Sequence, residues 1–248
     1  FAMVIFMTGM VVAQSNTAQL GQHGDDNSAT QEQNGYMNTS KFRVYGDDNT
    51  TNTDQDGNKN FSVAEVFGGL NDISVIQDGN QNNATAHIER WNSDNNDVSI
   101  TQIGNNNMAG QGNMGGFLGV DIDGSKNDAT IYQQGYSNKA NIMQEVEGSS
   151  RQKDAEFVSY NTAEIKQWGW GNNNEAFIHQ AGSNSFGKFD VKGSGNTTTL
   201  EQNIYISGGG SGNEHAYLTI RGNDNNAEFF QGGGSNNKIK GIGRPDFV

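Results

Sequence analysis

The sequence predicts an all-β fold, a β-solenoid of about nine two-strand rungs that form two facing parallel sheets. Three observations predict it: a repeat of 11 residues, a period-two pattern inside each repeat, and a composition too polar for an ordinary core. Only 32% of the 248 residues are hydrophobic, and the mean hydropathy is -0.75. The chain holds 35 Asn, 18 Gln and 34 Gly, a bias typical of chains that form β-ladders.

The repeat is the phrase Gln-x-Gly-x-x-Asn-x-Ala, which is complete at Gln22, Gln77, Gln102 and Gln133. Degraded copies fill the intervals. With the Gln position as an anchor, the chain divides into eighteen units, spaced by 11 residues from position 22 to position 77 and more widely in places after it. Such self-similarity indicates a stack of like units, and the wider spacings are expected to be insertions between strands.

Each unit is expected to be one strand followed by one turn. The anchor and the residues two and four before it alternate with polar residues, as in Ala140, Ile142 and Gln144, which is the pattern of a strand with one face inside. Gly reaches a positive φ, and Asn tolerates one while its amide bonds locally. The expected turn glycines are Gly24, Gly46, Gly79, Gly104 and Gly135.

Alternate units form two sets, so one rung is expected to hold two units and each set to keep its own sheet through every insertion. One set has Gln at every anchor but Glu156 and predicts an amide ladder in one sheet: Gln33, Gln55, Gln77, Gln102, Gln133, Gln180, Gln202 and Gln231. The other set is mostly apolar and is expected to give more hydrophobic stabilisation: Gln22, Val44, Val66, Trp91, Ile122, Gln144, Gln167, Val191 and Ile220.

Asn stands five residues after the anchor in fifteen of the eighteen units. Stacked rungs would bring these residues into two further ladders, one at each turn of the rung. The first is expected to hold Asn27, Asn49, Asn71, Asn96 and Asn127, and the second Asn38, Asn60, Asn82, Asn107 and Asn138.

The chain is expected to divide into four parts. Residues 1–13 are apolar and end in small residues, as the remnant of a signal peptide does, without its basic start. Residues 14–18 form a short N-terminal segment, residues 19–240 the solenoid, and residues 241–248 a C-terminal tail that is a candidate cap. Beyond residue 13 no apolar run is long enough to cross a membrane.

Composition and spacing argue against several functions. The formal charge of -13 repels phosphate, so nucleic acid is not expected as a partner. The four histidines, His23, His87, His179 and His215, fall at unrelated phases of the repeat. No catalytic or metal centre is therefore predicted, and no cofactor is expected.

One weak metal candidate remains in the acidic turns. Adjacent rungs are expected to bring Asp25, Asp26, Asp47 and Asp48 to one edge, because the two turns stand 22 residues apart. Oxygen-rich clusters attract Ca²⁺. The preferred alternative is a solvated turn whose charge discourages premature aggregation.

The repeat phrase, from residue 19 to about residue 240, resembles that of the curlin family, the subunits of bacterial curli fibres. The resemblance implies a secreted β-solenoid that polymerises head to tail with itself into an extracellular amyloid fibre on a bacterial cell surface, for biofilm matrix and adhesion. It also implies a nucleator subunit and a dedicated outer-membrane secretion pore as partners, and no enzymatic activity. The chain is longer than familiar five-repeat members, and the unit from Gln144 to Ala155 has lost its Gly and Asn.

A monomeric secreted β-solenoid, an adhesin or an ice-binding protein, is the alternative function. Ice binders show an outward Thr array that repeats from rung to rung, whereas Thr50, Thr51 and Thr53 form only a local cluster. An enzyme on a parallel β-helix would need longer rungs and clustered catalytic groups.

Overall fold

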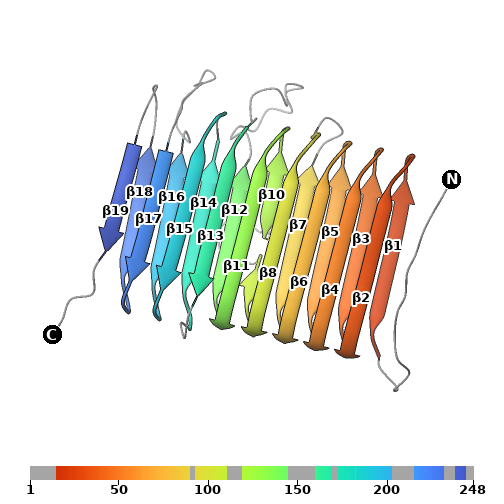
Figure 1. Ribbon diagram of the computed structural model, residues 1–248, viewed down its shortest axis with the longest axis horizontal. Helices are drawn as coiled ribbons and strands as arrows, with labels where there is room; N and C mark the ends of the chain where they lie inside the picture. The colour runs from red at the N-terminus through yellow and green to blue at the C-terminus, as the bar shows by residue number, and fades with distance from the viewer. Residues whose placement is uncertain are drawn as a thin grey trace.

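The computed structural model describes residues 15–89, 93–110, 119–144, 160–168, 172–181, 183–202, 215–231 and 238–243. Within them the fold is all-β and consists of two parallel sheets that face each other (Figure 1). The predicted solenoid is confirmed. None of the described segments is a helix long and apolar enough to span a bilayer.

The chain alternates between the sheets, so that each rung takes one strand from each. Sheet A holds, in spatial order, β1 (Thr17–His23), β3 (Thr39–Tyr45), β5 (Phe61–Phe67), β7 (Asn83–Glu89), β9 (Met108–Ala109) with β10 (Val120–Asp123), β12 (Lys139–Gln144), β14 (Glu175–Gln180), β16 (Thr197–Gln202) and β18 (Asn226–Gln231). Sheet B holds β2 (Ser28–Tyr36), β4 (Thr50–Asn58), β6 (Asp72–Asn80), β8 (Asp97–Asn105), β11 (Asp128–Tyr136), β13 (Thr162–Trp168), β15 (Phe186–Lys192), β17 (His215–Arg221) and β19 (Lys238–Gly243).

The register is fixed by the pleat. Gln33 lies on Gln55, and Gln55 lies on Gln77, so every inward position of one strand meets an inward position of the next. A slip of one residue would turn the whole inward row to solvent. The repeat therefore becomes columns of equivalent residues along the rod.

The core is the thin layer between the sheets. It is filled mainly by Ala, Val and Ile, and these side chains are almost fully buried along the rod, from Ala29 on β2 to Ile220 on β17. Larger side chains enter as Phe42 and Phe189. Because the interior is narrow, buried Ser, Thr, Asn and Gln share it with the apolar groups.

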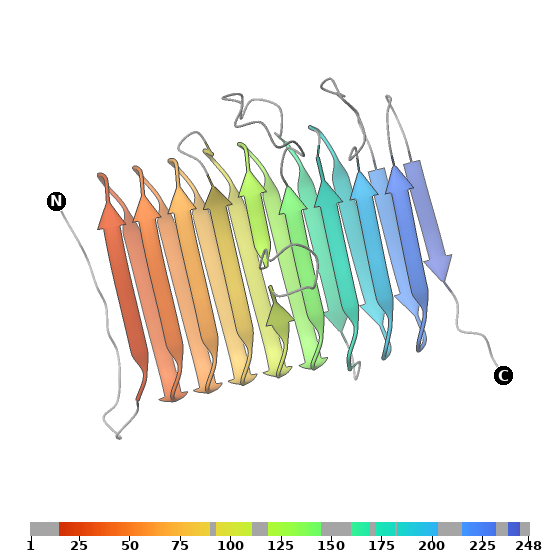
Figure 2. The same ribbon diagram turned by 180° about the vertical axis from the view of Figure 1, so that it is seen from behind.

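One insertion interrupts a strand of sheet A. β9 pairs with the starts of β7 and β12, and β10 pairs with their ends, so the two short strands fill one level in line with each other (Figure 2). Gly110 and Gly119, at the two inner ends, have φ of 111° and 92°. The prediction that insertions lie only between strands is wrong at this level, because Gly lets the chain leave and rejoin the ladder.

The solenoid is slightly longer than predicted. β1 begins at Thr17, which pairs with Thr39, and β19 reaches Gly243 because its residues continue to pair with β17. The expected segment 14–18 and tail 241–248 therefore overlap strands. The expected leader, residues 1–13, and the tail from residue 244 lie outside the described residues.

The turns differ from the prediction in which residue takes the positive φ. It is the Gly, as in Gly24 at 121°, and the residue before the Asn, as in Asp26 at 52°. Asn27 itself is not among the residues with positive φ. Its side chain instead accepts a hydrogen bond from the backbone N–H of Asn49 in the next rung.

Candidate functional site

An amide ladder runs through the interior of sheet B. In each step the Nε2 of one Gln donates to the Oε1 of the Gln one rung further along the chain. The distances are 2.7 Å from Gln33 to Gln55, 2.7 Å from Gln55 to Gln77, 2.9 Å from Gln77 to Gln102, 2.9 Å from Gln102 to Gln133 and 3.0 Å from Gln133 to Gln167.

The ladder then changes sheets. Gln167 is the last member in sheet B, where the next two levels hold Val191 and Ile220. A second ladder starts in sheet A: Gln144 donates to Gln180 at 2.9 Å, Gln180 to Gln202 at 2.8 Å, and Gln202 to Gln231 at 2.7 Å.

The prediction of one ladder in one sheet is therefore wrong for Gln180, Gln202 and Gln231, which lie in sheet A. The strand expected to end at Glu156 lies outside the described residues, and Gln133 pairs instead with Gln167. One predicted unit thus does not form a level of the ladder, and every later unit moves to the opposite sheet.

The apolar set changes sheets with it. Val44, Val66, Ile88 and Ile122 fill the anchor level of sheet A and are fully buried. Ile88 stands where Trp91 was expected, and Trp91 lies outside the described residues. That this apolar level stabilises the fold more than the Gln ladder stays a prediction.

Each ladder Gln also ties the two sheets together. Its second Nε2 hydrogen goes to the carbonyl of the residue that begins a strand of the opposite sheet, as from Gln55 to Thr39 at 3.1 Å and from Gln202 to Phe186 at 3.2 Å. Within a ladder, before its last Gln, both hydrogens of the buried amide are therefore used.

Polar atoms are left over where a ladder ends beside an apolar residue. Gln144 Oε1 is buried without a hydrogen bond, because the neighbouring level holds Ile122. Gln22 Nε2 is buried without a hydrogen bond, and its neighbour is Val44. Such atoms destabilise the folded chain unless another molecule bonds to them.

Two Asn ladders run along the turns. In each, the Oδ1 of one Asn accepts from the backbone N–H of its equivalent in the next rung, as Asn60 accepts from Asn82 at 3.0 Å and Asn49 from Asn71 at 3.0 Å. All ten predicted Asn residues lie in these ladders, in the two predicted groups. Further members are Asn16, Asn161, Asn174, Asn196 and Asn225.

The close stacking of the turns in neighbouring rungs also requires the turn Gly. Asn82 Nδ2 donates to the carbonyl of Gly104 at 2.8 Å, and successive glycines stack closely. A Cβ on Gly104 would lie 2.2 Å from the carbonyl oxygen of Gly135. The predicted Gly24, Gly46, Gly79, Gly104 and Gly135 all have a φ between 110° and 124°.

The four aspartates of the calcium candidate do not converge. Asp25, Asp26, Asp47 and Asp48 are exposed, and Asp47 Oδ1 accepts from the backbone N–H of Asp25 at 2.7 Å. No group of three or more metal-ligating side chains occurs in the described part of the chain. The geometry therefore gives the weak calcium candidate no support, and the preferred alternative, a solvated acidic turn, stays a prediction.

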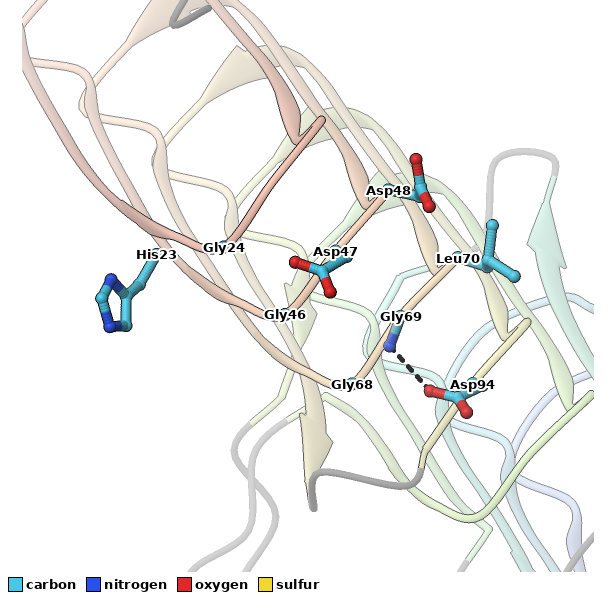
Figure 3. A pocket seen from close by; sticks show the side chains of 9 residues that line it. All are labelled: His23, Gly24, Gly46, Asp47, Asp48, Gly68, Gly69, Leu70 and Asp94. Carbon is cyan, nitrogen blue, oxygen red and sulfur yellow. Dashed lines mark hydrogen bonds between the residues drawn. The ribbon is translucent and has the colours of Figure 1, made fainter. Parts of the chain in front are cut away.

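A pocket of about 570 Å³ lies on this edge. Figure 3 shows its lining residues on stacked turns, where Asp94 accepts from the backbone N–H of Gly69 at 2.7 Å, as Asp47 does from Asp25 two steps earlier. Asp47 and Asp94, two of its lining residues, thus bond to the backbone of a neighbouring turn.

The histidines lie apart from one another along the rod. His87 has its ring nitrogens 3.8 Å from Glu65 and 3.9 Å from Asp121. Burial lowers the pKa of His179 to about 4, so its imidazole is neutral at neutral pH. No pair of histidines forms a site in the described residues.

The remaining surface of functional interest is the pair of open ends. β1 and β2 have no strand before them, and β18 and β19 have none after them in the described chain (Figure 1). Each end presents a row of backbone N–H and C=O groups that another strand can pair with.

Two stretches of the chain, residues 46–79 and 93–135, match the family model of the curlin associated repeat. They include β4, β6, β8 and β11, which carry the Gln ladder of sheet B. No curated protein matches the chain. The ladders, the paired sheets and the matched repeats agree, and the chain is a curlin-repeat protein.

Proposed function

We propose that this chain is the structural subunit of a secreted, curli-like amyloid fibre in which copies stack end to end. The observation that carries the proposal is that, in the described chain, strand pairing runs without a break from β1 to β18 in sheet A and from β2 to β19 in sheet B and stops only at the two open ends. A further copy extends both sheets without changing the fold.

The role is structural and not enzymatic. The fibre lies outside a bacterial cell and contributes to biofilm matrix and adhesion. A nucleator subunit and an outer-membrane secretion pore are the proposed partners. The match of two stretches to the curlin associated repeat supports these proposals.

The surface gives no support to an ice-binding role. The third residues of the first five strands of sheet B lie in one row, which reads Thr30, Asn52, Ser74, Ser99 and Thr130. In these described strands the row is polar but not a Thr array.

The test is assembly of the purified chain after release from denaturant at neutral pH, with and without preformed seeds. Thioflavin-T fluorescence and electron microscopy should show unbranched fibres whose lag phase is removed by seeds. A monomer that keeps β-type circular dichroism and does not elongate seeds would contradict the proposal.

A further inference from the structure

The junction between two stacked copies can be specified, given the proposed end-to-end assembly. We propose that β1 of one copy pairs in parallel with β18 of the preceding copy, in one register that places Gln22 on Gln231 and makes sheet A the specific half of the junction.

The register follows from the repeat itself. In every full pairing of sheet A, anchor lies on anchor, as Gln22 lies on Val44 and Gln202 on Gln231. The next strand onto β18 therefore begins with Thr17 opposite Asn226. Its anchor, Gln22, then falls opposite Gln231.

The unpaired amide of Gln22 finds both its partners at this junction. Within sheet A, Gln180, Gln202 and Gln231 donate to the carbonyls of the first residues of β13, β15 and β17, at 3.1, 3.2 and 3.1 Å. The next in that series is the carbonyl of Lys238, because Lys238 lies on His215. Gln22 Nε2, buried without a hydrogen bond in one copy, would donate to Lys238 of the preceding copy.

The ladder would continue in the same direction. Gln231 receives from Gln202 at 2.7 Å and donates to His215. Its remaining Nε2 hydrogen points along the series, where Gln22 Oε1 of the next copy accepts it. The change of ladder from sheet B to sheet A thus places a Gln at the C-terminal end of the sheet whose N-terminal end also carries one.

The apolar side chains at the two ends are complementary as well. Leu20, Ala227 and Phe229 are the partly buried hydrophobic residues that pack against the described core, and all three lie on β1 or β18. The register stacks Leu20 on Phe229 and Ala18 on Ala227. Their burial is completed only when a second copy is added.

Sheet B offers a weaker match. Its register would place Gln31 and Gln33 opposite Gly241 and Gly243, which have no side chain to continue an amide ladder. In sheet B the charged residues are unevenly distributed along the rod, and this supports the direction of the contact, not its register. β2, β4, β6, β8 and β11 contain seven Asp or Glu and no Lys or Arg, whereas β13, β15, β17 and β19 contain six Lys or Arg and two Asp or Glu.

This charge distribution favours a head-to-tail contact. The basic end of sheet B in one copy meets the acidic end in the next, while head-to-head or tail-to-tail contacts bring like charges together.

Disulfide trapping tests the register, because the chain contains no Cys. Gln19 and Glu228 are exposed residues on β1 and β18 that the register places opposite each other. Neighbouring strands lie roughly 4.8 Å apart, within the Cα separation that a disulfide spans. The double variant Gln19→Cys with Glu228→Cys is grown into fibres under reducing conditions, oxidised, and resolved by non-reducing gel electrophoresis.

The matched control is Gln19→Cys with Asn226→Cys, whose cysteines are displaced by two residues. The proposed register predicts a series of covalent multimers for the first pair, roughly ten-fold more than for the displaced pair. Equal or stronger linking of the displaced pair in well-formed fibres would overturn the register but leave end-to-end assembly intact. Absence of fibres from the unsubstituted chain would instead overturn the proposed function.

A second variant tests the role of the amide. Gln22→Leu removes a buried unpaired donor from the single copy, so the monomer should fold as stably as before. At the junction it leaves Gln231 and Lys238 unpaired, and seeded elongation should slow roughly ten-fold. Gln19→Leu, on the outer face of the same strand, is the control. Equal elongation by Gln22→Leu and Gln19→Leu would contradict the proposed hydrogen bonds.

Discussion

Gln102 uses both ends of its amide inside the solenoid. Its Nε2 donates to Gln133 and to the carbonyl of Asn83, each at 2.9 Å, and its Oε1 accepts from Gln77 at 2.9 Å. A buried amide is tolerated here because a copy of itself lies on either side. Because of these bonds, substitution of a single ladder residue is expected to lower the free energy of unfolding.

We expect Gln102→Ala to lower the free energy of unfolding by about 2–4 kcal/mol, because it opens a cavity and leaves buried groups of Gln77 and Gln133 unpaired. Gln134→Ala, an exposed amide on the neighbouring strand, should change it by less than about 0.5 kcal/mol. Denaturant unfolding of the unassembled chain measures both. Equal effects of the two substitutions would show that the ladder does not stabilise the fold.

The backbone geometry of the turn requires Gly at some positions of the repeat and not at others. Gly104 has a φ of 110°, and an added Cβ would meet the backbone of Gly135. Gly21, in the middle of β1, has nothing within 4 Å of an added Cβ.

Gly104→Ala should therefore destabilise the chain by roughly 3 kcal/mol or more, since backbone strain and overlap act together. Gly21→Ala should be neutral or slightly stabilising, because Ala restricts the unfolded chain more than Gly does. Thermal unfolding of the two variants side by side measures the difference. A tolerated Ala at position 104 would contradict the close stacking of the turns.

A row of carboxylates crosses three neighbouring strands of sheet B, where Asp97 lies between Asp72 and Asp128. Burial, followed by the charge of Asp97, raises the pKa of Asp72 above 3.8. The same two causes, with Glu164, raise the pKa of Asp128. A carboxyl group whose pKa is raised on folding binds its proton more tightly in the folded chain, so this row opposes folding as the pH rises through the raised value.

Asp97→Asn should accordingly stabilise the chain at pH 7, and the gain should shrink as the pH falls towards 3.8, where the neighbouring carboxyl groups are protonated anyway. Unfolding free energies of the variant and the unsubstituted chain, compared from pH 7 to pH 3.5, measure the gain. A gain independent of pH would mean that charge repulsion is not its cause.

The elements show how far the sequence alone predicts the fold. The strand pattern, the turn glycines and all ten Asn positions follow from the 11-residue phrase, because stacking repeats each local solution. The change of sheet could not be read from spacing, since the anchors at 133, 144, 156 and 167 are almost evenly spaced. The inward triplets do not assign the sheet either: Ala163, Ile165 and Gln167 repeat Ala129, Ile131 and Gln133 of sheet B, but the same triplet stands at Ala140, Ile142 and Gln144 of sheet A.

The contacts between the two sheets could not be predicted from the sequence either. The bond from each Gln to a carbonyl of the opposite sheet depends on how the sheets face each other, which the repeat does not encode. Asn174 was missed because two extra residues separate it from its anchor, Gln167. The weak calcium candidate rested on the proximity of the turns alone, which does not determine where the carboxylates point.

On the scale of the whole molecule, the described rod has two different ends. In the described residues it has nine levels in each sheet, an acidic and a basic end on sheet B, and matching Gln residues at the two ends of sheet A. In the proposed assembly, an added copy would bury the ends of both partners and create an end identical to the one it covers. Growth would then be unlimited in length and fixed in direction.

Electron cryomicroscopy of fibres grown from the purified chain tests this account most directly, through the axial repeat of the subunit. The account predicts strands perpendicular to the fibre axis and a repeat of nine levels, roughly 43 Å at the usual strand spacing, with β18 density continuous into β1 of the next copy. A fibre whose subunit repeat departs from nine levels, or in which the rods associate only side by side, would contradict end-to-end stacking.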